Sequence, residues 1–254
     1  ELSRNTTGGA NADVFENTGK GGAIYNNGTL TINSGSLTDN VAGKAAKLES
    51  ETATGAGGAI YNAGKMVISV GTEDAATTIS NNISYLDGGA IYNTGTANVY
   101  LEGNTVSGNS AVNGGAFYNA GTLTVTDNMN DPNTALDDGT APHNATFKGI
   151  TGNTATSGGA IYNEKGSLNV SYITISGNTA TTGGSAIHFA GGSGNISNVT
   201  IAENSGGSAA VAVDSGSLVF NFATIAMNSS AGLTVADGAT VKLNSTLIAV
   251  NGVD

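Results

Sequence analysis

The sequence has no cysteine, only 2 prolines, and charged residues at only 11% of its positions. Without cysteine the chain has no disulfide, no thiolate nucleophile and no cysteine-based zinc site. The scarcity of proline and the lack of a Gly-X-Y triplet exclude a collagen-like chain, although 39 of the 254 residues are glycine. Because charges are so few, Ser, Thr and Asn must cover most of the exterior.

Basic residues are the second shortage. Lys and Arg together number 8 against 19 Asp and Glu, so the net charge is −11 and the sequence pI is about 4.3. Such a charge disfavours nucleic acid and other phosphate ligands. No apolar run approaches the roughly 20 residues of a membrane-spanning helix, and no signal peptide opens the chain. Since Glu1 is not a native start, we expect a fragment of a longer protein.

The sequence does contain a repeat, built from two short boxes. Copies of the first, Gly-Gly-Ala-Ile-Tyr-Asn or a close variant, lie at Gly21–Asn26, Gly57–Asn62, Gly88–Asn93, Gly114–Asn119, Gly158–Asn163 and, in degenerate form, Gly183–Phe189. The second box is an aliphatic residue, two variable positions and Asn. Its copies end at Asn5, Asn40, Asn82, Asn109, Asn153, Asn178, Asn204, Asn228 and Asn251. The last copies recur about every 24 residues, and the longer earlier spacings indicate insertions.

Alternation within one repeat is that of short β-strands. The apolar residues of the repeat at 158–178 fall on one side of three short segments: Ile161, Leu168, Val170, Ile173 and Ile175. Each segment has a period of 2 and is rich in Val, Ile and Thr. One coil cannot bury its own inner face, so coils must stack with about 4.8 Å between neighbouring strands.

Other repeat folds fit less well. A leucine-rich repeat shares the period but requires an L-x-x-L-x-L signature, left-handed hexapeptide helices need multiples of six, and calcium-binding nonapeptide repeats need GGxGxD runs. None of these patterns occurs. We therefore predict an all-β protein, a right-handed parallel β-helix of about nine coils of roughly 24 residues, forming a single domain over residues 1–254.

The first box predicts a row of outward side chains. If Ile24 and its counterparts point inward, the next residue points outward, because strand side chains alternate. The outward row is Tyr25, Tyr61, Tyr92, Tyr118, Tyr162 and His188. Flat rings at this spacing can bind sugar rings or a partner chain, or can pack on one another as cross-strand pairs. The paired glycines suit a tight turn with positive φ or a close approach between coils.

The asparagines of the second box predict an interior ladder. Each side-chain amide can bond the turn backbone and its copy in the next coil. Their regular recurrence favours architecture over ligand binding, since a catalytic residue is needed only once. The predicted ladder consists of Asn40, Asn82, Asn109, Asn153, Asn178, Asn204, Asn228 and Asn251.

Four insertions interrupt the period, near residues 6–20, 41–56, 71–77 and 127–146. Loops that leave a rigid solenoid at fixed corners are the usual place for variable contacts. The longest insertion carries Asp131, Asp137 and Asp138, which suggest a Ca²⁺ site, since that ion takes several carboxylate and carbonyl oxygens. The alternative is a solvated acidic loop. No other cofactor is predicted.

No catalytic residue is predicted. Glycoside hydrolysis needs two carboxylates across one linkage, and no Asp or Glu recurs at adjacent coil positions on the predicted strands. The one arginine is Arg4, and His143 and His188 stand alone in the sequence. We therefore expect no enzyme, with a polysaccharide-degrading lyase or glycosidase as the alternative.

With these boxes in view, the chain resembles the repeats of the chlamydial polymorphic membrane proteins. That family is marked by tandem GGA(I/L/V) and FxxN tetrapeptides. Gly22-Ala23-Ile24 matches the first, and Ile175-Ser176-Gly177-Asn178 matches the second with Ile in place of Phe. The resemblance covers nearly the whole chain, although the last two coils lose the GGA box.

The resemblance implies an adhesin-like autotransporter passenger that is secreted and displayed at the cell surface. Its implied partners are a host-cell protein or glycan and the flanking domains of the same polypeptide. Nucleic acid is not an expected partner. The passenger would not itself span a membrane, and its anchor is expected outside this fragment.

Overall fold

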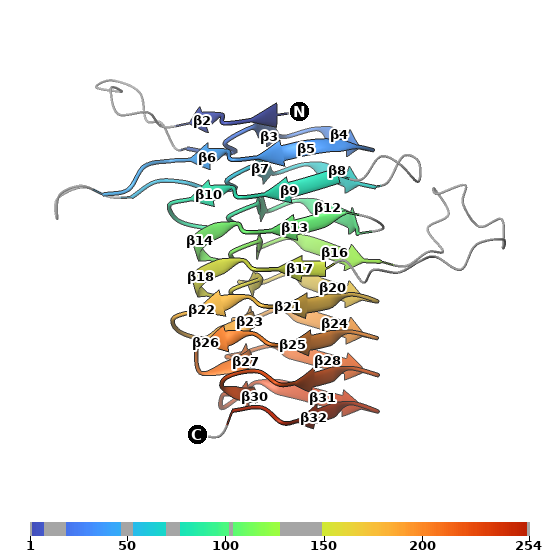
Figure 1. Ribbon diagram of the computed structural model, residues 1–254. Coiled ribbons are helices and arrows are strands. Elements are labelled where there is room, and N and C mark those ends of the chain that lie inside the picture. The colour runs from blue at the N-terminus through green and yellow to red at the C-terminus, as the bar shows by residue number, and fades with distance from the viewer. Residues whose placement is uncertain are drawn as a thin grey trace.

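The computed structural model describes residues 2–7, 19–46, 53–69, 77–101, 104–127 and 149–252, and these residues form a parallel β-helix (Figure 1). Every strand pairing in its four sheets is parallel, and no helix occurs among the described residues. The predicted right-handed parallel β-helix is confirmed. The described residues therefore contain no helix that could span a membrane.

The regular coil passes through four sheets in turn, which we name A to D, while the coil from β29 to β32 has no strand in sheet B. Sheet A contains β1 (Leu2–Ser3), β5 (Gly35–Thr38), β9 (Thr77–Ser80), β13 (Thr105–Ser107), β17 (Gly149–Thr151), β21 (Thr174–Ser176), β25 (Thr200–Ala202), β29 (Thr224–Ala226) and β32 (Leu247–Ala249). Sheet B contains β2 (Thr6–Thr7), β6 (Val41–Ala42), β10 (Ile83–Ser84), β14 (Ser110–Asn113), β18 (Thr154–Ser157), β22 (Thr179–Ala180) and β26 (Ser205–Gly206).

Sheets C and D complete the coil. Sheet C contains β3 (Ile24–Asn26), β7 (Ile60–Asn62), β11 (Ile91–Asn93), β15 (Phe117–Asn119), β19 (Ile161–Asn163), β23 (Gly184–Phe189), β27 (Ala209–Val213) and β30 (Ala231–Val235). Sheet D contains β4 (Thr29–Ile32), β8 (Lys65–Ile68), β12 (Thr96–Tyr100), β16 (Thr122–Thr126), β20 (Ser167–Ser171), β24 (Ser193–Ser197), β28 (Ser217–Asn221) and β31 (Thr240–Asn244).

The coil therefore has four strands where the sequence pattern indicates three. Sheet B is the additional one. Its seven strands each begin directly after an asparagine of the second box, from Asn5 to Asn204, and no sheet B strand follows Asn228. Five of its seven strands are only two residues long. Two residues cannot display an alternation of period 2, so the pattern contains no signal for them.

Successive coils pair in register, so equivalent residues of the repeat lie directly over one another. Ile60 pairs with Ile91, and Ile91 pairs with Phe117. All three side chains are completely buried. The inward positions of sheets A, C and D together fill the interior with aliphatic side chains and three phenylalanines. In a stack of coils each inward side chain therefore lies over the equivalent inward position of the next coil, as Ala97 lies over Leu123.

The two glycines of the first box serve different needs. Gly114 has φ of +66°, which side chains other than glycine rarely adopt. Gly115 has an ordinary φ, but a Cβ there would lie 2.2 Å from the carbonyl oxygen of Gly159 in the next coil. Both predicted reasons for the paired glycines are thus confirmed, one at each position.

Most of the predicted insertions fall outside the described residues. What the structure does describe is where they begin and end. The segment after β6 (Val41–Ala42) starts as two antiparallel arms, because the amides of Lys44 and Thr54 each donate to the carbonyl of the other at 3.1 Å. The longest insertion separates β16 of sheet D from β17 of sheet A.

A pair of glycine substitutions tests the close approach between coils. Gly115→Ala places a methyl group against the backbone of the next coil and should lower the free energy of unfolding by about 3 kcal/mol or more. Gly28→Ala is the matched control, since a Cβ at Gly28 meets nothing within 4 Å. Urea denaturation followed by far-ultraviolet circular dichroism measures both. Equal midpoints for the two variants would contradict the packing described.

Candidate functional site: the aromatic and asparagine ladders of sheet C

The tyrosines of the first box form one continuous stack on the outer side of sheet C. Consecutive ring centroids are 5.3, 4.9, 4.7 and 5.4 Å apart from Tyr25 to Tyr162, and neighbouring rings are within 16° of parallel. His188 ends the stack, with its ring 4.9 Å from that of Tyr162 and tilted by 31°. The strand spacing of a parallel sheet is close to the stacking distance of aromatic rings, so in-register pairing produces the stack without further adjustment.

Stacking decides which parts of the rings a ligand can reach. Each internal ring has a neighbour on both faces, so a sugar ring cannot lie flat against it. Exposure falls from 53% at Tyr25, which has one neighbouring ring, to 7% at Tyr118 in the middle of the stack. The structure thus offers ring edges and hydroxyl groups along the stack, together with one ring of larger exposure at Tyr25.

Burial and nearby negative charge raise the pKa of the inner phenols. Burial, followed by the neighbouring Tyr61 and the carboxylates of Asp87 and Glu164, together raise the pKa of Tyr92 to about 12. Burial also raises the pKa of Tyr118, with Asp87 and Glu164 adding to the effect. Burial raises the pKa of Asp87 itself, and a hydrogen bond from Asn113 opposes that shift.

A lysine side chain lies near the N-terminal end of the stack, at Tyr61. The ammonium nitrogen of Lys20 lies 5.0 Å from the ring centroid of Tyr61. This distance is within the range of a cation–π interaction. The N-terminal part of the stack therefore already contacts a positive charge of the same chain.

The asparagines of the second box form a buried ladder along the interior. The backbone N–H and the Nδ2 of Asn82 both donate to Oδ1 of Asn109, each at 2.9 Å. Asn109 makes the same two bonds to Asn153, and its Nδ2 also donates to the carbonyl of Ile79 at 3.1 Å. The pattern runs through Asn5, Asn40, Asn82, Asn109, Asn153, Asn178, Asn204, Asn228 and Asn251.

A second asparagine ladder lies inside sheet C, and the sequence reasoning missed it. The last residue of each first box donates from Nδ2 to Oδ1 of the next copy at 2.6 to 2.8 Å: Asn26, Asn62, Asn93, Asn119 and Asn163. The ladder ends where Nδ2 of Asn163 donates to the carbonyl of Gly191 at 2.7 Å. The signal was present, because period 2 places the box Asn on the same side as the box Ile.

His188 lies at the end of the predicted outward row, but it is not isolated as the sequence indicated. The fold places it between two polar side chains from other coils. Its Nδ1 is within hydrogen-bond distance of Ser157 Oγ, and its Nε2 lies 2.7 Å from Asp214 Oδ2. Residues 31 and 26 positions away in the chain are thereby brought to one imidazole.

The predicted Ca²⁺ ligands Asp131, Asp137 and Asp138 lie outside the described residues, as does His143. Among the residues that the structure does describe, no group of three or more His, Asp or Glu side chains is arranged to hold a metal ion.

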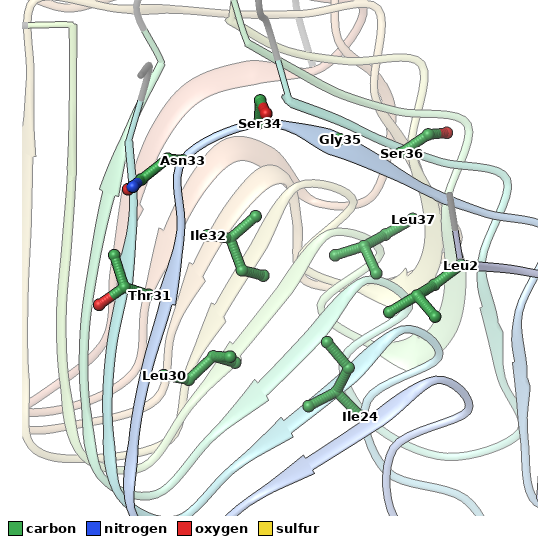
Figure 2. A pocket seen from close by; sticks show the side chains of 10 residues that line it. All are labelled: Leu2, Ile24, Leu30, Thr31, Ile32, Asn33, Ser34, Gly35, Ser36 and Leu37. Atoms are coloured by element: carbon green, nitrogen blue, oxygen red, sulfur yellow. The ribbon is translucent and has the colours of Figure 1, made fainter.

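One cavity opens at the N-terminal end of the solenoid (Figure 2). It has a volume of about 400 Å³, and its floor is the apolar interior of the first coils. Figure 2 shows the side chains of Leu30, Ile32 and Leu37 directed into it. The ten residues that line this cavity include no ionisable side chain, so it offers packing surface and no acid–base chemistry.

Removing one rung of the interior ladder should be costly. Asn153→Ala leaves the buried N–H and Nδ2 of Asn109 without their acceptor, and each unsatisfied group costs about 1–3 kcal/mol. We expect a clear fall in the urea midpoint. Asn195→Ala is the control, because Asn195 is exposed and its bond to Asn221 lies at the surface. A midpoint shift no larger than that of the control would contradict the ladder's role.

The environment of the phenols predicts the alkaline titration. The folded-state pKa of Tyr92 is raised to about 12, above the ordinary value near 10. Its contribution to stability is therefore present below about pH 10 and is lost as the pH rises through about 12. Tyrosinate absorbance should show phenols of the folded chain that ionise above the ordinary pKa near 10. In urea the same phenols should ionise near that ordinary pKa.

Glu164→Gln tests the electrostatic part of that shift. The substitution removes a negative charge and should lower the pKa of Tyr118. Glu203→Gln is the control, since Glu203 lies at an exposed corner and takes no part in the shifts of these tyrosines. Identical titration curves for the two variants would show that Glu164 does not act on the stack.

Comparison with known proteins agrees with this architecture. The family model described as the Chlamydia polymorphic membrane protein repeat matches residues 76–94, 145–164 and 172–190. Each matched segment contains one copy of both boxes. Neither the search of curated proteins nor that of solved structures finds a match. The chain is thus a parallel β-helix in which three segments are similar to the repeat of the Chlamydia polymorphic membrane proteins.

Proposed function

We propose that the chain is an adhesin-like passenger, displayed at the cell surface or secreted, which attaches to a host-cell protein or glycan. The observation that carries the proposal is the threefold match to the Chlamydia polymorphic membrane protein repeat, on coils that also carry the aromatic stack. The repeat and the fold determine only the architecture. The binding function must therefore reside in surfaces that differ from coil to coil.

Two features of the solenoid suit this function. Its interior is cross-linked by two asparagine ladders, which consist of residues of the repeat boxes and include no residue of the insertions. The insertions begin at coil corners, as between β16 and β17, where added residues do not disturb the pairing of the sheets. Variable loops on a rigid scaffold are a common basis for recognition. We assign them the larger part of the binding, with Tyr25 and the ring edges of the stack as the second surface.

Polysaccharide cleavage is the alternative, and the geometry favours it less. Cleavage requires two carboxyl groups about 5–10 Å apart across an accessible sugar linkage. Asp87 and Glu164 flank the stack, but Asn113 donates to Asp87 at 2.9 Å and Lys165 lies 3.5 Å from Glu164. Tyr118, the phenol on which both carboxylates act, is itself buried. We therefore propose that the chain works by binding.

Binding can be tested by applying the whole chain to a glycan array and to plates coated with host-cell membrane protein. We expect saturable binding to at least one class of ligand without release of product. Removal of residues 128–146 should reduce the affinity at least tenfold, and Tyr25→Ala should reduce it by a smaller factor. Thr96→Ala, an exposed position on sheet D, serves as the control and should change nothing.

Three outcomes separate the proposals. No saturable binding to any ligand on the array or the membrane protein would overturn the adhesin. Release of reducing ends or unsaturated sugars from polysaccharide would establish the enzyme instead. Equal loss of binding in the Thr96→Ala control would show that the effect does not come from the insertions or the stack.

A further inference from the structure

The coil that contains β23 departs from the repeat at several positions together. Its box reads Gly-Gly-Ser-Ala-Ile-His-Phe, with Ser185 as an additional residue and His188 in the tyrosine column. The additional residue shifts the register between Gly184 and Ile187. Such irregularities are over-represented next to active sites, where they redirect a side chain. The regular repeat is therefore modified at the coil that carries the histidine.

Three side chains from successive coils meet at this position. Ser157 is the last residue of β18, His188 lies in β23, and Asp214 directly follows β27. A carboxylate can only accept, so the contact of 2.7 Å to Asp214 places the proton of a neutral imidazole on Nε2. Nδ1 is then the acceptor, and the hydroxyl of Ser157 donates to it. The hydrogen bonds thus run from serine to histidine to aspartate.

The surroundings hold this arrangement in place. A Cβ at Gly183 would lie 2.1 Å from Nδ1 of His188 and 2.3 Å from Oγ of Ser157, so only glycine leaves room for the pair. The ring of Tyr162 packs 4.9 Å from the imidazole. The side chain of His188 is 13% exposed and that of Asp214 is 57% exposed. The histidine is therefore confined while the aspartate remains hydrated.

We propose that Ser157 is a nucleophile, that His188 is its general base, that Asp214 positions the histidine, and that the serine takes acyl groups from esters. A nucleophile within hydrogen-bond reach of a base, which a third group orients, is the general signature of such a site. Triads are recognised by geometry and roles rather than by sequence order. This activity goes beyond the proposed binding function and does not depend on it.

The chemistry balances with water as the second substrate. Oγ of Ser157 attacks the ester carbonyl carbon while Nδ1 of His188 takes the hydroxyl proton, and the tetrahedral intermediate expels the alcohol with that proton. An ester bond on the serine remains. Water then attacks this ester with the same histidine as base, which releases the carboxylic acid and restores the serine. Asp214 stabilises the imidazolium in both steps.

The test uses a fluorophosphonate probe on the folded chain, with intact-mass measurement and peptide mapping. We expect one label per chain, located on Ser157. His188→Asn should slow labelling at least about 100-fold, in the range of general-base catalysis. Asp214→Asn should slow it at least tenfold, and Asp214→Glu should restore part of the rate, which a purely structural aspartate would not require. Ser193→Ala, at an exposed serine of β24, is the matched control and should label as the parent does.

Labelling of the unsubstituted chain decides the question even where a variant fails to fold. No label, a label on another residue, or a labelled Ser157 whose rate is unchanged by His188→Asn would each overturn the proposal. Turnover is measured separately with p-nitrophenyl acetate, for which Ser157→Ala should abolish the initial burst of nitrophenolate. Ligand binding by Ser157→Ala should equal that of the parent chain. The binding function and the nucleophilic serine are therefore tested independently of each other.

Discussion

Parallel pairing of successive coils, in register, is the constraint on which the rest of the structure depends. Each coil presents the same strand edge to the next, so every position of the repeat meets its own counterpart about 4.8 Å away. Ile60, Ile91 and Phe117 lie in one interior column for this reason. A residue type that tolerates its own copy at that distance is favoured at every position. Aliphatic side chains, asparagine, tyrosine and glycine all do so.

The two asparagine ladders show how the same constraint satisfies buried polar groups. An amide carries both donors and an acceptor, so a column of identical residues can bond head to tail without leaving a group unpaired. Asn109 illustrates this, since it donates to Asn153, accepts from Asn82 and also bonds the carbonyl of Ile79. A charged residue at this place would meet a like charge in the next coil. The low charge content of the chain follows from the same repulsion.

The aromatic stack shows the functional consequence. Stacking that stabilises the outer side of sheet C also covers the ring faces that recognition would use. Variation is therefore more effective where the repeat is broken, at the insertions and at the coil of His188. There the column of tyrosines ends at an imidazole, and Ala212 and Thr234 continue it. A change of residue in one coil thereby brings a histidine into contact with Ser157 and Asp214.

The sequence by itself determined the fold class, the coil period, and the inward and outward sides of the strands, and it gave the two alternative reasons for the paired glycines. These follow from local alternation and spacing, which do not require knowledge of distant contacts. The second asparagine ladder was also within reach, because Asn26 lies two residues after Ile24 in the same short strand. Only the tertiary structure decided the two-residue strands of sheet B and the grouping of Ser157, His188 and Asp214. Those depend on which residues the register places side by side, and coils of unequal length conceal that register in the sequence.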